Sequence, residues 1–113
     1  MIIDFLEGKE KAVSTLKKFP KEDLATTFIN RYELLKYKKY AAISEAVDNL
    51  FTYQSEDIAL EASAQEYMKL KLRGITMSDN DLLIFGVCIA NDEELITQDK
   101  AFKHIGSRLI TII

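Results

Sequence analysis

Three carboxylates stand where chemistry could take place, although they lie far apart in the sequence. Glu33 follows the stretch LATTFI by a few residues, Asp81 opens the most apolar run, and Asp99 follows the stretch LIT after one intervening residue. If they converge, the three carboxylates form an all-oxygen site, which suits hard cations such as Mg²⁺ or Mn²⁺. Such an ion can orient a water molecule as nucleophile and neutralise the charge that builds up on a phosphodiester.

The composition favours this chemistry over several others. The chain has 113 residues, enough for one compact domain, and its single Cys88 and single His104 cannot build a zinc site of thiolates and imidazoles. The apolar run 82–90 is far shorter than the ~18 residues of a membrane span, and the N-terminus lacks the features of a signal peptide. We therefore expect a cytoplasmic protein. A net charge of -3 argues against a broadly basic surface for nucleic acid.

The hydrophobic pattern predicts alternating strands and helices that would position these acids. We expect helices over residues 10–19, 30–50, 55–74 and 78–94, and strands over residues 24–29, 51–54, 95–97 and 108–113. Ser55 is a candidate cap and Gly74 a stop signal for the third helix. The alternation predicts an α/β fold with a parallel sheet covered by helices on both faces. Ligands of such sheets bind at the carboxyl ends of the strands, so the three acids should share one edge.

A purely structural interpretation stands beside this one. The pairs Asn30 with Glu33 and Ser78 with Asp81 match or nearly match a capping box, in which the acid satisfies backbone N–H groups at a helix start. Asp99 could cap a following helix in the same way. Capping does not require the acids to share one edge of the sheet, so their convergence would separate the two interpretations.

The segments INRYELL, SDNDLLIFGVCIAND and LITQDKAFKHIG resemble the signature segments of PIN-domain ribonucleases, in particular the VapC-like toxins of prokaryotic toxin–antitoxin pairs. The resemblance implies one domain over 1–113 with a three-layer α/β/α fold, in which four acids hold Mg²⁺ or Mn²⁺ for RNA cleavage. Glu33 matches the second acid, Asp81 the third and Asp99 the fourth. It also implies a homodimer and a VapB-like antitoxin that covers the acids.

Two residues beside these acids are candidates for outer ligands. Thr97 matches a hydroxyl that often sits beside the fourth acid in the family. Asp79 lies two residues before the third acid, although an acid at a helix start that faces water is the simpler interpretation.

The first acid of the family pattern has no match. Family members open with a short apolar strand that ends in Asp-Thr, and a segment like IIDFLEG follows, which places the first acid before Met1. The resemblance therefore implies that the first strand, which is central in this fold, is absent. Either Met1 is internal to a longer reading frame, or the protein is a degenerate, inactive relative. Asp4 is a candidate substitute, but IDFLEG reads as the start of a helix that faces the wrong way.

Other stretches carry weaker predictions. The stretch KYKKY interleaves basic and aromatic residues, so Lys36, Lys38 and Lys39 are candidate RNA contacts. A solvated helix end is the alternative interpretation. Gly86 should permit close packing, and Cys88 should be a small buried hydrophobe. Two further hypotheses are a non-catalytic module that binds an antitoxin, and an α/β binding domain whose acids are only caps.

Overall fold

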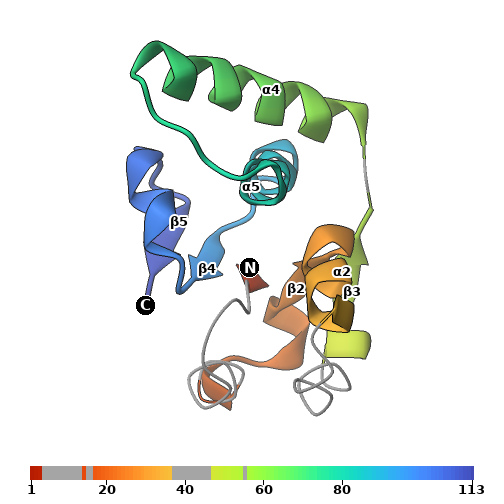
Figure 1. Cartoon of the computed structure of the whole chain (residues 1–113). Helices are drawn as coiled ribbons and strands as arrows, with labels where there is room; N and C mark the ends of the chain where they lie inside the picture. Colours follow the sequence, from red (N-terminus) through yellow and green to blue (C-terminus); the bar gives the residue numbers. More distant parts are fainter. Residues whose placement is uncertain (4–13, 15–16, 37–46, 55) are drawn as a thin grey trace.

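The computed structural model describes residues 1–3, 14, 17–36, 47–54 and 56–113 (Figure 1). Its strands form one parallel sheet in the order β3-β2-β1-β4-β5. The strands are β1 (Ile2–Ile3), β2 (Ala25–Thr27), β3 (Phe51–Tyr53), β4 (Leu95–Thr97) and β5 (Ile110–Ile112). The helices are α2 (Phe28–Lys36), α4 (Asp57–Leu72) and α5 (Asp79–Asn91), with short 3₁₀ turns η1 (Lys21–Asp23) and η3 (Lys100–His104). The predicted α/β class is confirmed.

The central position of the sheet is occupied, and the expectation of an unfilled slot there is wrong. Ile2 pairs in parallel with Ala25 of β2 on one side and with Leu95 of β4 on the other. The Ile2 side chain is fully buried, because a β-branched apolar residue fits a strand covered on both faces. A strand of two residues carries no readable periodicity, which is why the sequence pattern pointed to a helix start instead. Asp4 follows this strand in the chain and lies outside the described residues.

The second strand ends earlier than its composition predicts. The β-branched and aromatic run over 24–29 favours a strand, yet α2 begins at Phe28. The Thr27 side chain decides the boundary, because its Oγ1 accepts a hydrogen bond from the backbone N–H of Asn30 at 3.0 Å. The same hydroxyl donates to Asn30 Oδ1 at 2.7 Å. This buried pair caps α2 directly at the carboxyl end of β2.

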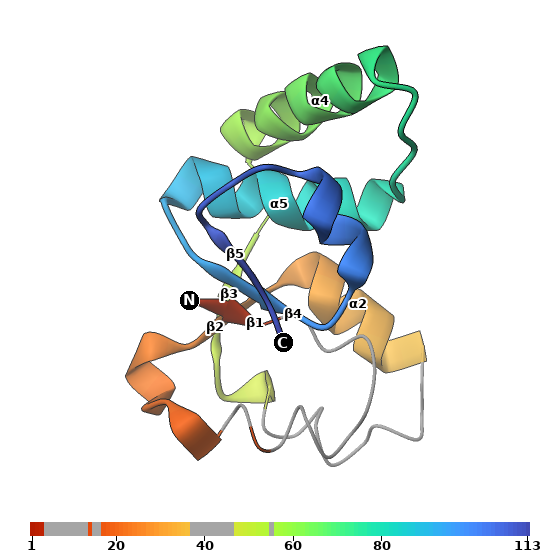
Figure 2. The same ribbon diagram turned by 90° about the vertical axis from the view of Figure 1, so that its left-hand side faces the viewer.

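Helix α5 lies between the sheet and α4, so that it is covered on several sides (Figures 1 and 2). This arrangement explains why its sequence is almost wholly apolar. The two helices meet at Gly86, where an added Cβ would lie 1.9 Å from Ser63 Oγ and 2.4 Å from the Ala59 carbonyl oxygen. The predicted close approach at Gly86 is therefore confirmed, and Cys88 is buried as expected.

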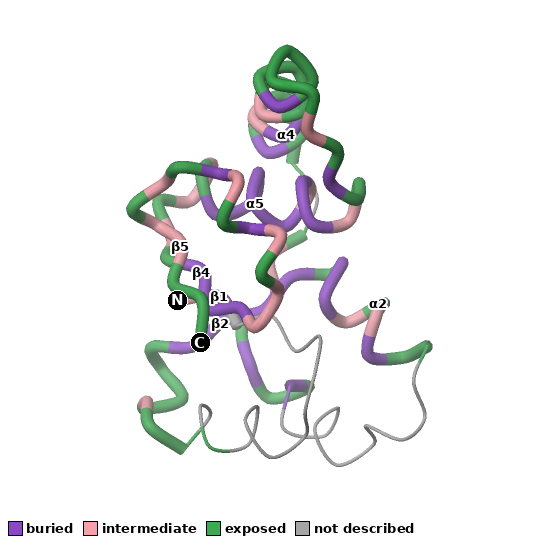
Figure 3. Tube along the Cα trace, turned by 60° about the vertical axis from the view of Figure 1, so that its left-hand side comes forward, coloured by how far each residue is buried: buried purple, intermediate pink, exposed green. Residues whose placement is uncertain are grey.

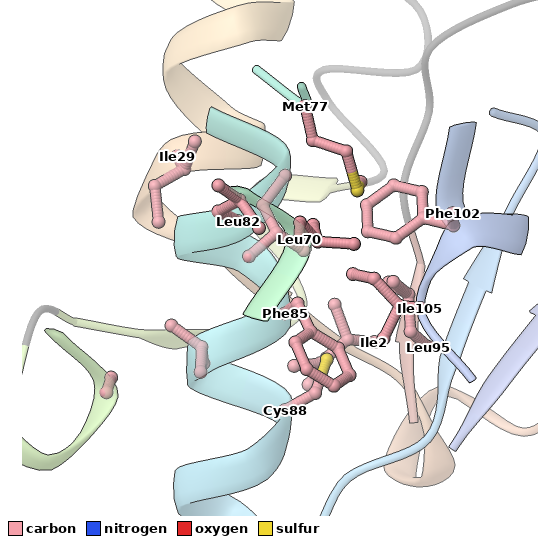
Figure 4. Packing of buried hydrophobic residues seen from close by; sticks show 14 residues of the cluster. Ile2, Ile29, Leu70, Met77, Leu82, Phe85, Cys88, Leu95, Phe102 and Ile105 are labelled. Carbon is pink, nitrogen blue, oxygen red and sulfur yellow. The ribbon is translucent and has the colours of Figure 1, made fainter. Parts of the chain in front are cut away.

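Both faces of the sheet carry a hydrophobic core. Ala25 and Leu95 belong to the larger cluster, which α5 covers, while their chain neighbours Leu24 and Ile96 belong to the smaller one. Successive residues of a strand point to opposite faces, so the sheet must be covered on both. Figure 3 shows the burial along the trace, and Figure 4 shows α5 side chains of the larger cluster, such as Phe85, packed toward the sheet.

The ends of the helices follow the predicted signals in part. Gly74 adopts a φ of 71° just after α4, a left-handed conformation that glycine adopts without steric cost. Ser78 is the N-cap of α5, as its position suggests. Ser55, the predicted cap of α4, lies outside the described residues, as do most of the predicted helix 10–19 and the region 37–46 of the predicted helix 30–50. In the described parts of the chain, no helix has the length and apolar character to cross a membrane.

Candidate active site

Asp81 is positioned by the start of α5. Ser78 Oγ accepts a hydrogen bond from the backbone N–H of Asp81 at 3.2 Å, which closes the first turn of the helix. Asp81 is only 6% exposed, whereas its neighbour Asp79 is exposed. A cap residue would be free to face water, so the burial of Asp81 requires a further explanation.

Asp99 is positioned by the end of β4. The buried Thr97 uses Oγ1 to accept a hydrogen bond from the backbone N–H of Asp99 at 3.0 Å. Asp99 Oδ1 in turn accepts from the backbone N–H of Ala101 at 2.9 Å, so this acid caps the short turn η3. The predicted structural role of Asp99 is thus present. Its second carboxylate oxygen takes no part in that cap.

The shifted pKa of Asp81 shows that the other two predicted acids are near it. The pKa of Asp81 is raised from its ordinary value of 3.8 to about 6, mainly by burial, with further contributions from the charge of Asp99, a side-chain hydrogen bond with Asp99 and the charge of Glu33, while the Ser78 hydrogen bond lowers it. A hydrogen bond between two carboxyl groups needs a shared proton, because ionised carboxylates only accept. Asp81 and Asp99 therefore lie close together, and Glu33 is near enough for its charge to raise the pKa of Asp81.

Glu33 reaches the same edge from α2. Its Oε1 accepts a hydrogen bond from Asn80 Nδ2 at 3.0 Å, while Oε2 is buried without a hydrogen-bond partner. Within the described ranges, no three side chains among histidine, cysteine, aspartate and glutamate form a ready-made group of metal ligands. Sequence reasoning missed Asn80, because its contact joins two elements that are 47 positions apart and leaves no local signal.

The remaining candidates have mixed outcomes. Asp79 is exposed and borders a groove beside α4, and Thr97 orients Asp99 through its backbone N–H. Lys36 is exposed, and its Nζ lies 4.9 Å from the centre of the Tyr32 ring in a cation–π contact. Lys38 and Lys39 lie outside the described residues.

The described chain has many structural relatives, although no family model and no curated protein sequence matches it. One is VapBC-5 of the VapBC family of toxin-antitoxin systems from Mycobacterium tuberculosis, with a TM-score of 0.76, 25% identity, and coverage of 99% of this chain and 95% of that chain. VapBC-1 from nontypeable Haemophilus influenzae gives a TM-score of 0.75 at 19% identity, covering 98% and 96% of the two chains. VapBC2 from Rickettsia felis, bound to a promoter DNA fragment, gives 0.70 at 21% identity, covering 100% and 99%.

These likenesses extend over nearly the whole chain and agree with the order of segments that the sequence resemblance used. The sheet is parallel, helices follow its strands, and the predicted acids come from α2, the start of α5 and the loop after β4. The chain therefore has the fold of a VapC-like PIN domain, of the kind found in VapBC toxin–antitoxin structures.

Proposed function

We propose that the protein is a metal-dependent endoribonuclease of the PIN/VapC kind, a single cytoplasmic domain that acts on RNA phosphodiester bonds. The observation that carries the proposal is the pairing of Asp81 with Asp99 in the presence of Glu33. Helix capping explains one contact of Asp81 and one of Asp99, but it does not explain why Asp81 is buried beside an acid from a separate element. Carboxylates that repel one another have shifted pKa values, which cluster at functional sites, and a bound cation would relieve the repulsion.

The donor chemistry fits Mg²⁺ or Mn²⁺. Glu33 Oε2 is a buried acceptor without a donor, and Asp81 is a buried carboxylate whose repulsion by Asp99 and Glu33 a cation would relieve. All three donors are carboxylate oxygens, which hard divalent cations prefer. A bound ion would supply charge neutralisation on the phosphodiester and lower the pKa of the attacking water. Thr97 and Ala101 hold Asp99 in place, and Ser78 holds the helix turn that carries Asp81.

Metal dependence is the first test. With the full chain at pH 7.5, saturating Mn²⁺ should stabilise the fold by about 1 to 3 kcal/mol relative to EDTA, because the ion binds only the folded acids. The same preparation should cleave a single-stranded RNA with Mn²⁺ and not with EDTA. Melting temperature and gel-resolved cleavage provide the two measurements, with sodium chloride at equal ionic strength as the control. No shift and no cleavage would leave the acids as caps only.

A non-catalytic interaction module is the second candidate function. What favours it is that the described residues include counterparts of only three of the four acids that the resemblance implies, with Asp4 outside the described ranges. Such a module would bind its partner but show neither Mn²⁺-dependent stabilisation nor cleavage. Loss of cleavage in Asp4→Asn would assign a role to this acid, whereas unchanged cleavage would assign the reaction to the other three.

We propose that the partner is a VapB-like antitoxin, and that part of it lies in a groove beside the acids. The groove has a volume of about 430 Å³ between α4 and the start of α5. Its walls are mainly apolar and its rim carries Asp79, which suits an amphipathic segment with a basic side chain. The lining residues are Leu60, Ser63, Ala64, Tyr67, Asp79, Leu82 and Leu83. Homodimerisation, which the resemblance also implies, is testable by sedimentation equilibrium of the same chain.

Leu60→Asp should weaken this partnership at least about tenfold, because it places a charge in the apolar wall of the groove. Leu72→Asp is the matched control, since Leu72 is an exposed leucine of the same helix that does not line the groove. Calorimetric titration with the product of a small antitoxin-like gene adjacent to this one would measure both affinities. Equal affinities for the two variants would remove the groove from the interface.

A further inference from the structure

Asn80 joins the two helices that carry the acids. It lies in the first turn of α5, between the exposed Asp79 and the buried Asp81, and its amide donates to Glu33 Oε1 at 3.0 Å. Successive helix residues point about 100° apart, so Asp81 and Asn80 leave the same turn toward different partners. In this arrangement α5 contributes an acid to the site and, at the preceding residue, a neutral donor toward α2.

The hydrogen bond has a consequence for the other oxygen of Glu33. A carboxylate has two oxygens in a fixed plane, so fixing Oε1 also fixes the place of Oε2. Oε2 is buried and has no hydrogen-bond partner. Burying an acceptor without a donor is unfavourable, so a position of this kind requires a ligand or another compensating role.

The chemistry of the amide also matters. An ionised aspartate at position 80 could not donate to Glu33 and would add a further negative charge beside Asp81. A lysine would donate, but as a permanent cation beside Glu33 it would compete with a bound metal ion. A neutral amide fixes the carboxylate and leaves its charge available.

We propose that Asn80 is a positioning residue that holds the Glu33 carboxylate so that Oε2 is available to a divalent cation. This inference rests on the proposed function, because it assigns Asn80 a role toward the same cation. Asn80 touches neither substrate nor metal in this role and acts only through Glu33.

The test is Mn²⁺ binding by the full chain without RNA, followed by the electron paramagnetic resonance signal of free Mn²⁺. Asn80→Ala should weaken Mn²⁺ affinity by about 10- to 100-fold, as is common when a residue that orients a metal ligand is removed. Asn91→Ala is the matched control, because Asn91 is in the same helix and its amide donates to the Val87 carbonyl at 2.9 Å. The control should keep the affinity of the unmodified protein.

A double-mutant cycle separates positioning from a general loss of helix stability. In a Glu33→Ala background, Asn80→Ala should change Mn²⁺ affinity less than about twofold, because the carboxylate through which it acts is gone. In the metal-free protein, the side-chain amide resonance of Asn80 should shift on Glu33→Ala and stay in place on Asp57→Asn.

The outcomes are distinct for the two claims. Equal Mn²⁺ affinities of Asn80→Ala and the unmodified protein, or an undiminished effect of Asn80→Ala without Glu33, would overturn the role of Asn80 while leaving Mn²⁺-dependent cleavage intact. Absence of Mn²⁺ binding by the unmodified protein would overturn both.

Discussion

Asp81→Asn should abolish Mn²⁺-dependent RNA cleavage and, in the absence of metal, make the protein more stable at pH 8. The first effect follows from the loss of a charged oxygen from the proposed site, and we expect cleavage to fall by at least about a hundredfold. The second follows from the removal of a buried charge that lies beside Asp99 and close to Glu33. Loss of function with a gain in stability is the pattern of a residue placed for chemistry.

The gain in stability should depend on pH in a defined direction. The pKa of Asp81 rises from 3.8 to about 6 on folding, so the folded protein binds this proton more tightly than the unfolded chain. The acid therefore costs nothing below pH 3.8, and its destabilising effect grows as the pH rises and is complete above about 6. Two pKa units correspond to about 3 kcal/mol, and screening by water at the sheet edge reduces this to roughly 1 to 2 kcal/mol.

Thermal melts in EDTA at pH 3.5 and pH 8 would measure the effect. The variant should melt roughly 5 °C above the unmodified protein at pH 8 and together with it at pH 3.5. Asp57→Asn is the control, because Asp57 is an exposed acid in the first turn of α4. This substitution removes the same charge as Asp81→Asn. A variant that still cleaves RNA with Mn²⁺ would refute the role of Asp81, and equal melting temperatures at pH 8 would refute its buried pairing with Asp99.

Gly86→Ala should destabilise the protein by about 2 to 4 kcal/mol, although alanine favours a helix over glycine by about 1 kcal/mol. An added Cβ would overlap Ser63 Oγ and the Ala59 carbonyl oxygen, at 1.9 and 2.4 Å. Ser63 cannot easily withdraw, because its hydroxyl lies 2.8 Å from the Leu82 carbonyl oxygen and 2.9 Å from that of Ala59. The two helices must therefore separate, and the layer that carries Asp81 moves with α5.

The midpoint of urea unfolding would measure this loss. Gly106→Ala is the matched control, because an added Cβ there meets nothing within 4 Å, and its midpoint should hardly change. Combining Gly86→Ala with Ser63→Ala should recover part of the stability, since one of the two overlaps disappears. A Gly86→Ala protein as stable as the control would mean that α4 and α5 do not meet as closely as described.

Local signals in the sequence predicted some of these features well. Ser78 was recognisable as a cap, because a serine precedes an apolar helix by one residue, and Gly74 was recognisable as a stop. Asp99 was recognisable as a strand-end acid, because LIT is short, apolar and followed at once by polar residues. Parallel topology then led to the prediction that the acids meet at one edge of the sheet.

Long-range contacts were beyond the reach of the same signals. The strand β1 is too short to show a period, and its assignment depends on partners near both ends of the chain. The end of β2 depends on the Thr27 side chain, which caps α2 within a run of strand-forming residues. Residue propensities alone predict that the strand continues through this run. The pair of Asn80 with Glu33 depends on how α2 and α5 approach, which only the packed structure reveals.

The central strand also sets the width across which the acids must meet. Because β1 lies between β2 and β4, the segments that carry Glu33 and Asp99 leave the sheet two strand spacings apart, or about 10 Å. A longer side chain is needed to reach inward across such a distance, and a glutamate is one methylene longer than an aspartate. The position of β1 thus sets the distance between the segments that carry Glu33 and Asp99. This distance gives a geometric reason for one glutamate in a set of otherwise shorter acids.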